Sequence, residues 1–117
     1  MTRRPANIVT ATGDEQHTTI EYSGGARQQL ACKEIGSEQM LAAALASCAF
    51  RSVFLLLERN EMPATALHIG IAKRGDAFLV KLEGLPMDHT FRRKAGQAIR
   101  ICPVAKQLRV ATIVETG

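Results

Sequence analysis

Two of the three cysteines in the sequence occupy positions suited to thiol chemistry. Cys48 lies in an alanine-rich apolar run, where a free cysteine taken alone is interpreted as a small packing side chain. Cys102 directly precedes Pro103 at a predicted helix break, so its sulfur can face the exposed amide hydrogens of the next helix, a setting that favours the thiolate. Two cysteines placed in this way are compatible with a reversible disulfide between a nucleophilic and a resolving thiol.

The remaining residues that could bind metals or catalyse reactions are dispersed. Cys32 lies near the end of a predicted strand and is interpreted as structural or incidental. His17, His68 and His89 fall on a hairpin, a strand and a loop, without the spacing of cysteines or carboxylates that a metal site needs. A glycine-rich phosphate loop and a Ser-His-Asp order are also absent from the sequence. We therefore expect neither a metal nor an organic cofactor.

Cys48 must be positioned by a long helix, which the sequence predicts over residues 39–59. Ser37 is a good N-cap, and Glu38 places a negative charge where the helix dipole favours it. Asn60 and Pro63 end the helix. Its first half is apolar on nearly every side, which predicts that it lies at the centre of the fold.

The rest of the chain predicts short strands and two shorter helices. Alternating apolar and polar positions predict the hairpins 7–12 with 18–22 and 67–73 with 77–82, and a further strand can form around 29–32. Asp88 or Thr90 can cap a helix that ends near Cys102, and Pro103 begins a short helix to residue 108, followed by a strand over 110–114. The expected order is ββ-α-ββ-α-α-β, an α+β fold.

Length, composition and charge exclude several classes of protein. The 117 residues make a single domain over 1–117, with 4% aromatic residues and a net charge of +4 that is dispersed along the chain. Without a basic stripe or aromatic platforms, nucleic-acid binding is not expected. The basic run 92–94 is interpreted as a solvated face, with a phosphate-bearing ligand as the alternative.

Neither export nor membrane insertion is expected. The basic N-terminus is not followed by an apolar segment of the kind that a signal peptide requires. The longest apolar stretch is interrupted at Arg51, before the roughly 20 residues that span a bilayer. We therefore expect a cytoplasmic protein, in which a framework of structural disulfides is not expected either.

Two segments resemble a known family. Residues 37–48, SEQMLAAALASC, followed by CPVAKQL at residues 102–108 and a last strand, resemble the OsmC/Ohr family of osmotically inducible and organic hydroperoxide resistance proteins. The resemblance runs from about Gly36 to the C-terminus. It implies an OsmC-like fold with a long central helix and an intertwined homodimer.

The resemblance also implies an activity, namely thiol-dependent reduction of organic hydroperoxides in oxidative-stress defence. Cys48 would attack the peroxide as the peroxidatic residue, and Cys102 would resolve the resulting sulfenic acid. The substrate would be a small apolar hydroperoxide and the reductant a dithiol, with no metal or cofactor. The apolar surroundings of Cys48 suit such a substrate.

Glu38 matches the glutamate that, in the family, helps to position an active-site arginine. Ten helical residues rise about 15 Å, so Glu38 and Cys48 of one straight helix cannot touch. Antiparallel central helices from two subunits can bring them together, which agrees with the homodimer that the resemblance implies. The alternative interpretation of Glu38 is compensation of the helix dipole in the first turn.

One departure from the family pattern leads to a second functional hypothesis. The arginine that activates the cysteine in the peroxidases lies in or just after the first hairpin, where this chain has Asp-Glu-Gln-His at residues 14–17. Arg27 and Arg51 are candidates to replace it, although Arg51 can equally be a solvated side chain on the helix. Without the arginine, the same dimer could be a non-catalytic binding or structural module, so enzymatic activity is left open at this stage.

Overall fold

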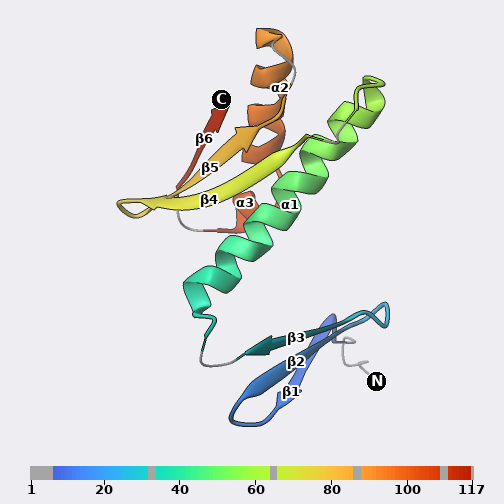
Figure 1. The fold of residues 1–117 in the computed structure, drawn as a ribbon, viewed down its shortest axis with the longest axis vertical. Helices are drawn as coiled ribbons and strands as arrows, with labels where there is room; N and C mark the ends of the chain where they lie inside the picture. Colours follow the sequence, from blue (N-terminus) through green and yellow to red (C-terminus); the bar gives the residue numbers. More distant parts are fainter. Residues whose placement is uncertain (1–6, 32–33, 64–65, 86–87, 109–110, 117) are drawn as a thin grey trace, which may run out of the picture. The chain divides into compact units, whose positions relative to one another are not determined.

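The computed structural model describes residues 7–31, 34–63, 66–85, 88–108 and 111–116. They fall into two compact units, Met1–Met40 and Leu41–Gly117, which are described separately below. Figure 1 shows the elements of both units.

The first unit contains a three-stranded antiparallel sheet. Its strands are β1 (Val9–Gly13), β2 (His17–Tyr22) and β3 (Arg27–Ala31), in the order β1-β2-β3. Asp14 Oδ1 accepts hydrogen bonds from the backbone N–H groups of Gln16 and His17 at 2.8 and 2.9 Å, which fixes the first turn. The predicted hairpin is confirmed, and β3 is a full third strand that the expected ββ-α order left out. Cys32, just beyond it, lies outside the described residues.

The long helix α1 (Ser37–Arg59) begins two residues before the predicted range 39–59, and the predicted N-cap Ser37 is its first helical residue. The carbonyl of Gly36 accepts from the Met40 N–H at 3.1 Å, which makes Gly36 and not Ser37 the capping residue. Gln39 Oε1 accepts from the Gly36 N–H at 2.9 Å, one half of a capping box. Gly36 takes the capping position because the side chain of Gln39, at the third helical position, accepts a hydrogen bond from the Gly36 amide.

The second unit contains a three-stranded mixed sheet with the central strand β5. β4 (His68–Arg74) pairs antiparallel with β5 (Ala77–Glu83), and β6 (Thr112–Thr116) pairs parallel with β5 on its other side. Gly75, with φ of 60°, makes the β4–β5 turn in a region that few other residues adopt. The second predicted hairpin is confirmed, whereas β6 starts at Thr112 and Val110 lies outside the described residues.

Two short helices precede β6. The side chain of Asp88 caps α2 (His89–Arg100) by accepting from the Thr90 N–H at 2.8 Å, as predicted for one of the two candidate caps. Cys102 is the N-cap residue of α3 (Pro103–Gln107), and Pro103 occupies its first turn. α2 packs along β6 (Figure 1).

One apolar core holds the second unit together, and α1 contributes a single stripe to it. The stripe repeats every four residues and packs with the inner face of β5 and with α2; its members are Leu45, Ala49, Val53 and Leu57, against Phe78, Val80, Leu82, Phe91, Ala95 and Ile99. α1 thus contributes one of its faces to this core. Large apolar side chains on its other faces are 41–47% exposed, namely Met40, Leu41, Phe50, Phe54 and Leu55.

Among the helices of the described residues, α1 alone is long and apolar enough to cross a membrane. Its best window has a mean hydropathy of 2.0, because Arg51 interrupts the apolar run without lowering the average much. Length and composition are weak indicators here, since the core helix of a soluble protein meets the same criterion. One stripe of α1, formed by Leu45, Ala49, Val53 and Leu57, lies in the core of the second unit.

Candidate functional site

The second unit brings Cys48 and Cys102 together. Cys48 lies at mid-length in α1, and Cys102 lies at the junction of α2 and α3. The side chain of Cys102 is within hydrogen-bonding reach of Cys48, and both are free cysteines. Cys102 is 2% exposed and belongs to the apolar core, whereas Cys48 is half-buried and packs against that core. The pair thus joins an accessible sulfur to an enclosed one.

The environment of Cys102 keeps its thiol protonated. Burial among apolar side chains raises the pKa of Cys102 above the ordinary value of 9.0, and this is the largest effect. Hydrogen bonding from the Ala105 and Val104 backbone amides lowers the pKa of Cys102, but by less than burial raises it. The expectation that the start of α3 favours a Cys102 thiolate is therefore wrong, since desolvation outweighs the amides.

Contact with Cys48 also raises the pKa of Cys102. The hydrogen bond with Cys48 and the charge of Cys48 further raise the pKa of Cys102. Burial and the neighbouring Cys48 thus both keep the proton on the Cys102 thiol. This arrangement suits a first oxidation at Cys48, followed by attack of Cys102 on the oxidised sulfur.

The other candidate residues lie on α1 and on the sheet of the first unit. Glu38 lies in the first turn of α1, ten residues before Cys48, which corresponds to about 15 Å along a straight helix. Arg27 pairs with Glu21 at 3.2 Å on the sheet of the first unit. Arg51 is exposed on α1, three residues after Cys48.

The histidines do not assemble a metal site in the residues that the structure describes. His17 begins β2, His68 begins β4 and His89 begins α2. Over the described ranges, no three histidine, cysteine, aspartate or glutamate side chains lie together in a way that could hold a metal ion.

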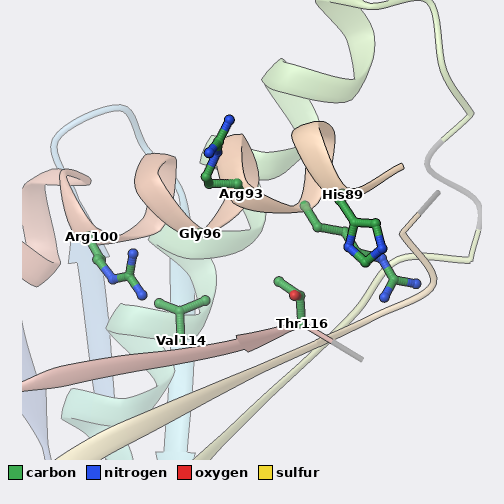
Figure 2. Close-up of a pocket in the computed structure, with 7 residues that line it drawn as sticks. His89, Arg93, Gly96, Arg100, Val114 and Thr116 are labelled. Atoms are coloured by element: carbon green, nitrogen blue, oxygen red, sulfur yellow. The ribbon is translucent and has the colours of Figure 1, made fainter. Parts of the chain in front are cut away.

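A groove between α2 and β6 was not predicted from the sequence. It has a volume of about 340 Å³ and contains neither Cys48 nor Cys102; its lining residues are His89, Arg92, Arg93, Gly96, Arg100, Val114 and Thr116 (Figure 2). The sequence indicated a basic face at residues 92–94. The signal that could have found the groove is the spacing of His89, Arg92, Gly96 and Arg100, which places them on one face of a helix.

Comparisons with known proteins identify the fold. No family model and no curated protein matches the sequence. Among solved structures, a candidate osmotic-stress-induced and detoxification response protein from Psychrobacter arcticus matches with a TM-score of 0.80 and 13% identity, over 99% of this chain and 98% of that one. An OsmC-like protein from Mycoplasma pneumoniae matches with a TM-score of 0.66 and 13% identity, over 100% and 98% of the two chains.

A third solved structure connects the fold to peroxide resistance. A candidate organic hydroperoxide resistance protein from Vibrio cholerae, with captopril bound in one of its active sites, matches with a TM-score of 0.57 and 16% identity, over 99% of this chain and 94% of that one. The likeness extends over almost the whole length of each chain. The resemblance found in the sequence is thereby confirmed, and the chain has the α+β fold of the OsmC-like and organic hydroperoxide resistance proteins.

Proposed function

We propose that the protein reduces small organic hydroperoxides with Cys48 and Cys102 and acts in oxidative-stress defence in the cytoplasm. The observation that carries this proposal is the hydrogen-bonding approach of two free thiols, 54 residues apart in sequence, inside one apolar core. The fold that the chain shares with a candidate organic hydroperoxide resistance protein supports it.

The proposed reaction needs only the two sulfurs and the peroxide. The Cys48 thiolate attacks the terminal oxygen of the hydroperoxide; an S–O bond forms, the O–O bond breaks, and the departing alkoxide takes up a proton to leave as an alcohol. Cys48 is then a sulfenic acid. The Cys102 sulfur attacks it, which forms the disulfide and releases water.

The two cysteines are suited to different roles. Cys48 is half-buried whereas Cys102 is enclosed, so we assign Cys48 as the sulfur that a peroxide reaches. Cys102 is enclosed and its pKa is raised, so it remains a thiol until the neighbouring sulfur is oxidised. Its position next to Cys48 allows condensation before a second peroxide oxidises the sulfenic acid further.

The proposal includes a homodimer built on the exposed apolar faces of α1. Phe50 and Phe54 stack with ring centroids 6.2 Å apart and planes 17° apart, yet both are more than 40% exposed. A second copy would cover these rings and complete an apolar site for an alkyl hydroperoxide. In antiparallel packing, Glu38 of one protomer would approach Cys48 of the other.

A dithiol reductant would return the disulfide to two thiols by thiol–disulfide exchange. Neither a metal nor an organic cofactor enters the proposed cycle. Arg51 and Arg27 are the candidates for the cation that assists Cys48. Arg27 would first have to leave its ion pair with Glu21.

The proposal is tested by counting thiols lost after addition of tert-butyl hydroperoxide to the wild type, Cys48→Ser and Cys102→Ser, with Cys32→Ser as the matched control. We expect the wild type and Cys32→Ser to lose two thiols per peroxide and Cys48→Ser to lose none. Cys102→Ser should lose one thiol and proceed to a sulfinic acid. Equally small losses in all four proteins would refute the enzyme and leave the non-catalytic module.

A further inference from the structure

A hydroxyl group of the second unit is buried without a hydrogen-bond partner. It is Oγ1 of Thr112, the first residue of β6, and among the residues that the structure describes it is the one buried side-chain oxygen or nitrogen left unpaired. A buried hydroxyl that makes no hydrogen bond is unfavourable, because it has given up its contacts with water. Folded proteins keep few such groups, so the presence of this one calls for a reason.

The pairing of β6 with β5 shows which way the Thr112 side chain faces. Thr112 lies opposite Phe78, a residue of the apolar core. Side chains alternate between the two faces of a strand, so Thr112, Val114 and Thr116 share one face. Val114 and Thr116 line the groove between α2 and β6, so this face looks toward α2 (Figure 2).

The course of β6 places Thr112 level with the end of α2. The strand runs in the opposite direction to the helix, and the guanidinium of Arg100 extends toward Val114 (Figure 2). Val114 Cγ1 also lies 3.8 Å from the position of a Cβ built on Gly96. Two strand residues span about 6.6 Å, which corresponds to about four residues of helix. The next position on this face, Thr112, therefore falls level with the junction of α2 and α3, where Cys102 is buried.

The surroundings of Cys102 give a hydroxyl at this level a use. Its sulfur lies in the apolar core, and Cys48 is the titratable side chain that acts on it. Burial outweighs the hydrogen bonding from the Val104 and Ala105 amides, so the pKa of Cys102 is raised. Loss of the Cys102 proton thus creates a negative charge in a site that is short of donors. A hydroxyl without a partner in the reduced protein can donate to that charge.

We propose that the Thr112 hydroxyl assists the resolving step by donating a hydrogen bond to the Cys102 sulfur as this sulfur loses its proton. The inference rests on the proposed function. In that step Cys102 attacks the sulfur of the Cys48 sulfenic acid: the S–S bond forms, the S–O bond breaks, and the departing hydroxide takes up the Cys102 proton and leaves as water. A donor held close to the developing charge lowers the barrier of this step.

The stability of Thr112→Val separates this role from a structural one. Valine replaces the hydroxyl by a methyl group of similar size. Because the hydroxyl is unpaired in the reduced protein, we expect the urea midpoint of reduced Thr112→Val to equal or exceed that of the wild type, measured by circular dichroism. A lower midpoint would show that the hydroxyl already stabilises the reduced fold and would overturn the proposal.

Single-turnover kinetics test the step itself, in the Cys32→Ser background after addition of tert-butyl hydroperoxide. We expect Thr112→Val to leave the oxidation of Cys48 unchanged within about twofold and to slow disulfide formation about tenfold. Thr112→Ser keeps a hydroxyl and should restore the rate. Thr116→Val is the matched control, since it makes the same substitution on the same face of β6 at the other end of α2. Equal disulfide rates in Thr112→Val and Thr116→Val would contradict the proposal.

A measurement without peroxide distinguishes a failure of this inference from a failure of the proposed function. In Cys32→Ser, Cys48→Ser, Cys102 is the sole thiol, and the ultraviolet absorbance of its thiolate reports its pKa; the contribution of the single tyrosine is common to all variants. We expect Thr112→Val to raise the pKa of Cys102 by about one unit and Thr116→Val to leave it unchanged. An unchanged pKa in both variants would overturn the inference alone, whereas the expected shift in a protein that peroxide does not oxidise would overturn the proposed function and, with it, the resolving step.

Discussion

The chemistry of Cys102 depends on how its surroundings hold its proton. Helix α3 begins at this residue, which alone would favour a thiolate. The apolar core and the neighbouring Cys48 act in the opposite direction and raise the pKa of Cys102. A sulfur in this state is a poor first nucleophile, which suits the resolving role proposed for Cys102.

A difference in alkylation between Cys48 and Cys102 follows from this. With iodoacetamide at pH 8, we expect Cys48 to be modified first, because Cys102 is 2% exposed and its pKa is raised. The rate at Cys102 should rise with pH and continue to rise beyond pH 9.0, the ordinary pKa of a thiol. Peptide mass spectrometry measures both rates, and Cys102 reacting first at pH 8 would contradict the assigned roles.

The sequence indicated which two of the three cysteines could act as a pair. It did not indicate the direction in which the pKa of Cys102 is shifted. A cysteine in an alanine-rich helix and a Cys-Pro pair at a helix start are visible in the chain itself. The protonation of Cys102 depends on side chains that are remote in sequence, such as Leu45 and Val80 of the same core. Burial by distant residues has no local signal, which is why the expected thiolate was wrong.

At the scale of elements, three local signals were reliable, whereas the predicted cap at Ser37 was not. The turn at Gly75, the cap at Asp88 and the break at Pro103 each depend on a residue with a specific backbone preference, and each was located correctly. β3 has the polar sequence RQQLA, which lacks clear alternation, so its extent was not evident. The basic groove escaped notice because it requires α2 to lie against β6, a contact between elements.

Replacing either of two glycines of the second unit by alanine should change the stability of the protein, in opposite directions at the two positions. Gly96→Ala should stabilise the protein by about 1 kcal/mol, because glycine weakens a helix interior and the new Cβ would meet Val114 at an ordinary 3.8 Å. Gly84→Ala should destabilise it by roughly 2 kcal/mol or more, since φ is 81° and the Cβ would collide with the Ala66 carbonyl.

Urea denaturation followed by circular dichroism measures both variants against the wild type. Stabilisation by Gly84→Ala would show that the turn after β5 differs from the one described. Strong destabilisation by Gly96→Ala would show that α2 packs closer to β6 than the structure indicates.

At the scale of the whole molecule, the proposed homodimer would cover the exposed apolar side chains of α1. We expect the wild type to be a dimer and the double variant Phe50→Ser, Phe54→Ser to dissociate, because burial of each ring stabilises an interface by about 1.5–3 kcal/mol, which is tenfold or more in affinity. Ile101→Ser is the matched control, since Ile101 is 64% exposed on a different element. Size-exclusion chromatography with light scattering measures the mass.

A dimer that survives the double phenylalanine substitution would place the interface elsewhere. If the wild type is a monomer, no second copy covers the apolar site at Cys48, and the proposed homodimer is wrong. The fold itself would be unaffected by either outcome, because the core of the second unit is built within one chain.

The central claim is that Cys48 and Cys102 of one chain form a reversible disulfide when a hydroperoxide oxidises the protein. Its most direct test is a non-reducing peptide map of Cys32→Ser after one equivalent of tert-butyl hydroperoxide. We predict one cross-linked peptide pair joining Cys48 to Cys102 within a single chain, lighter by two hydrogen atoms and lost on addition of a dithiol. Unmodified cysteines, or Cys48 oxidised to a sulfinic acid with Cys102 still free, would contradict the account.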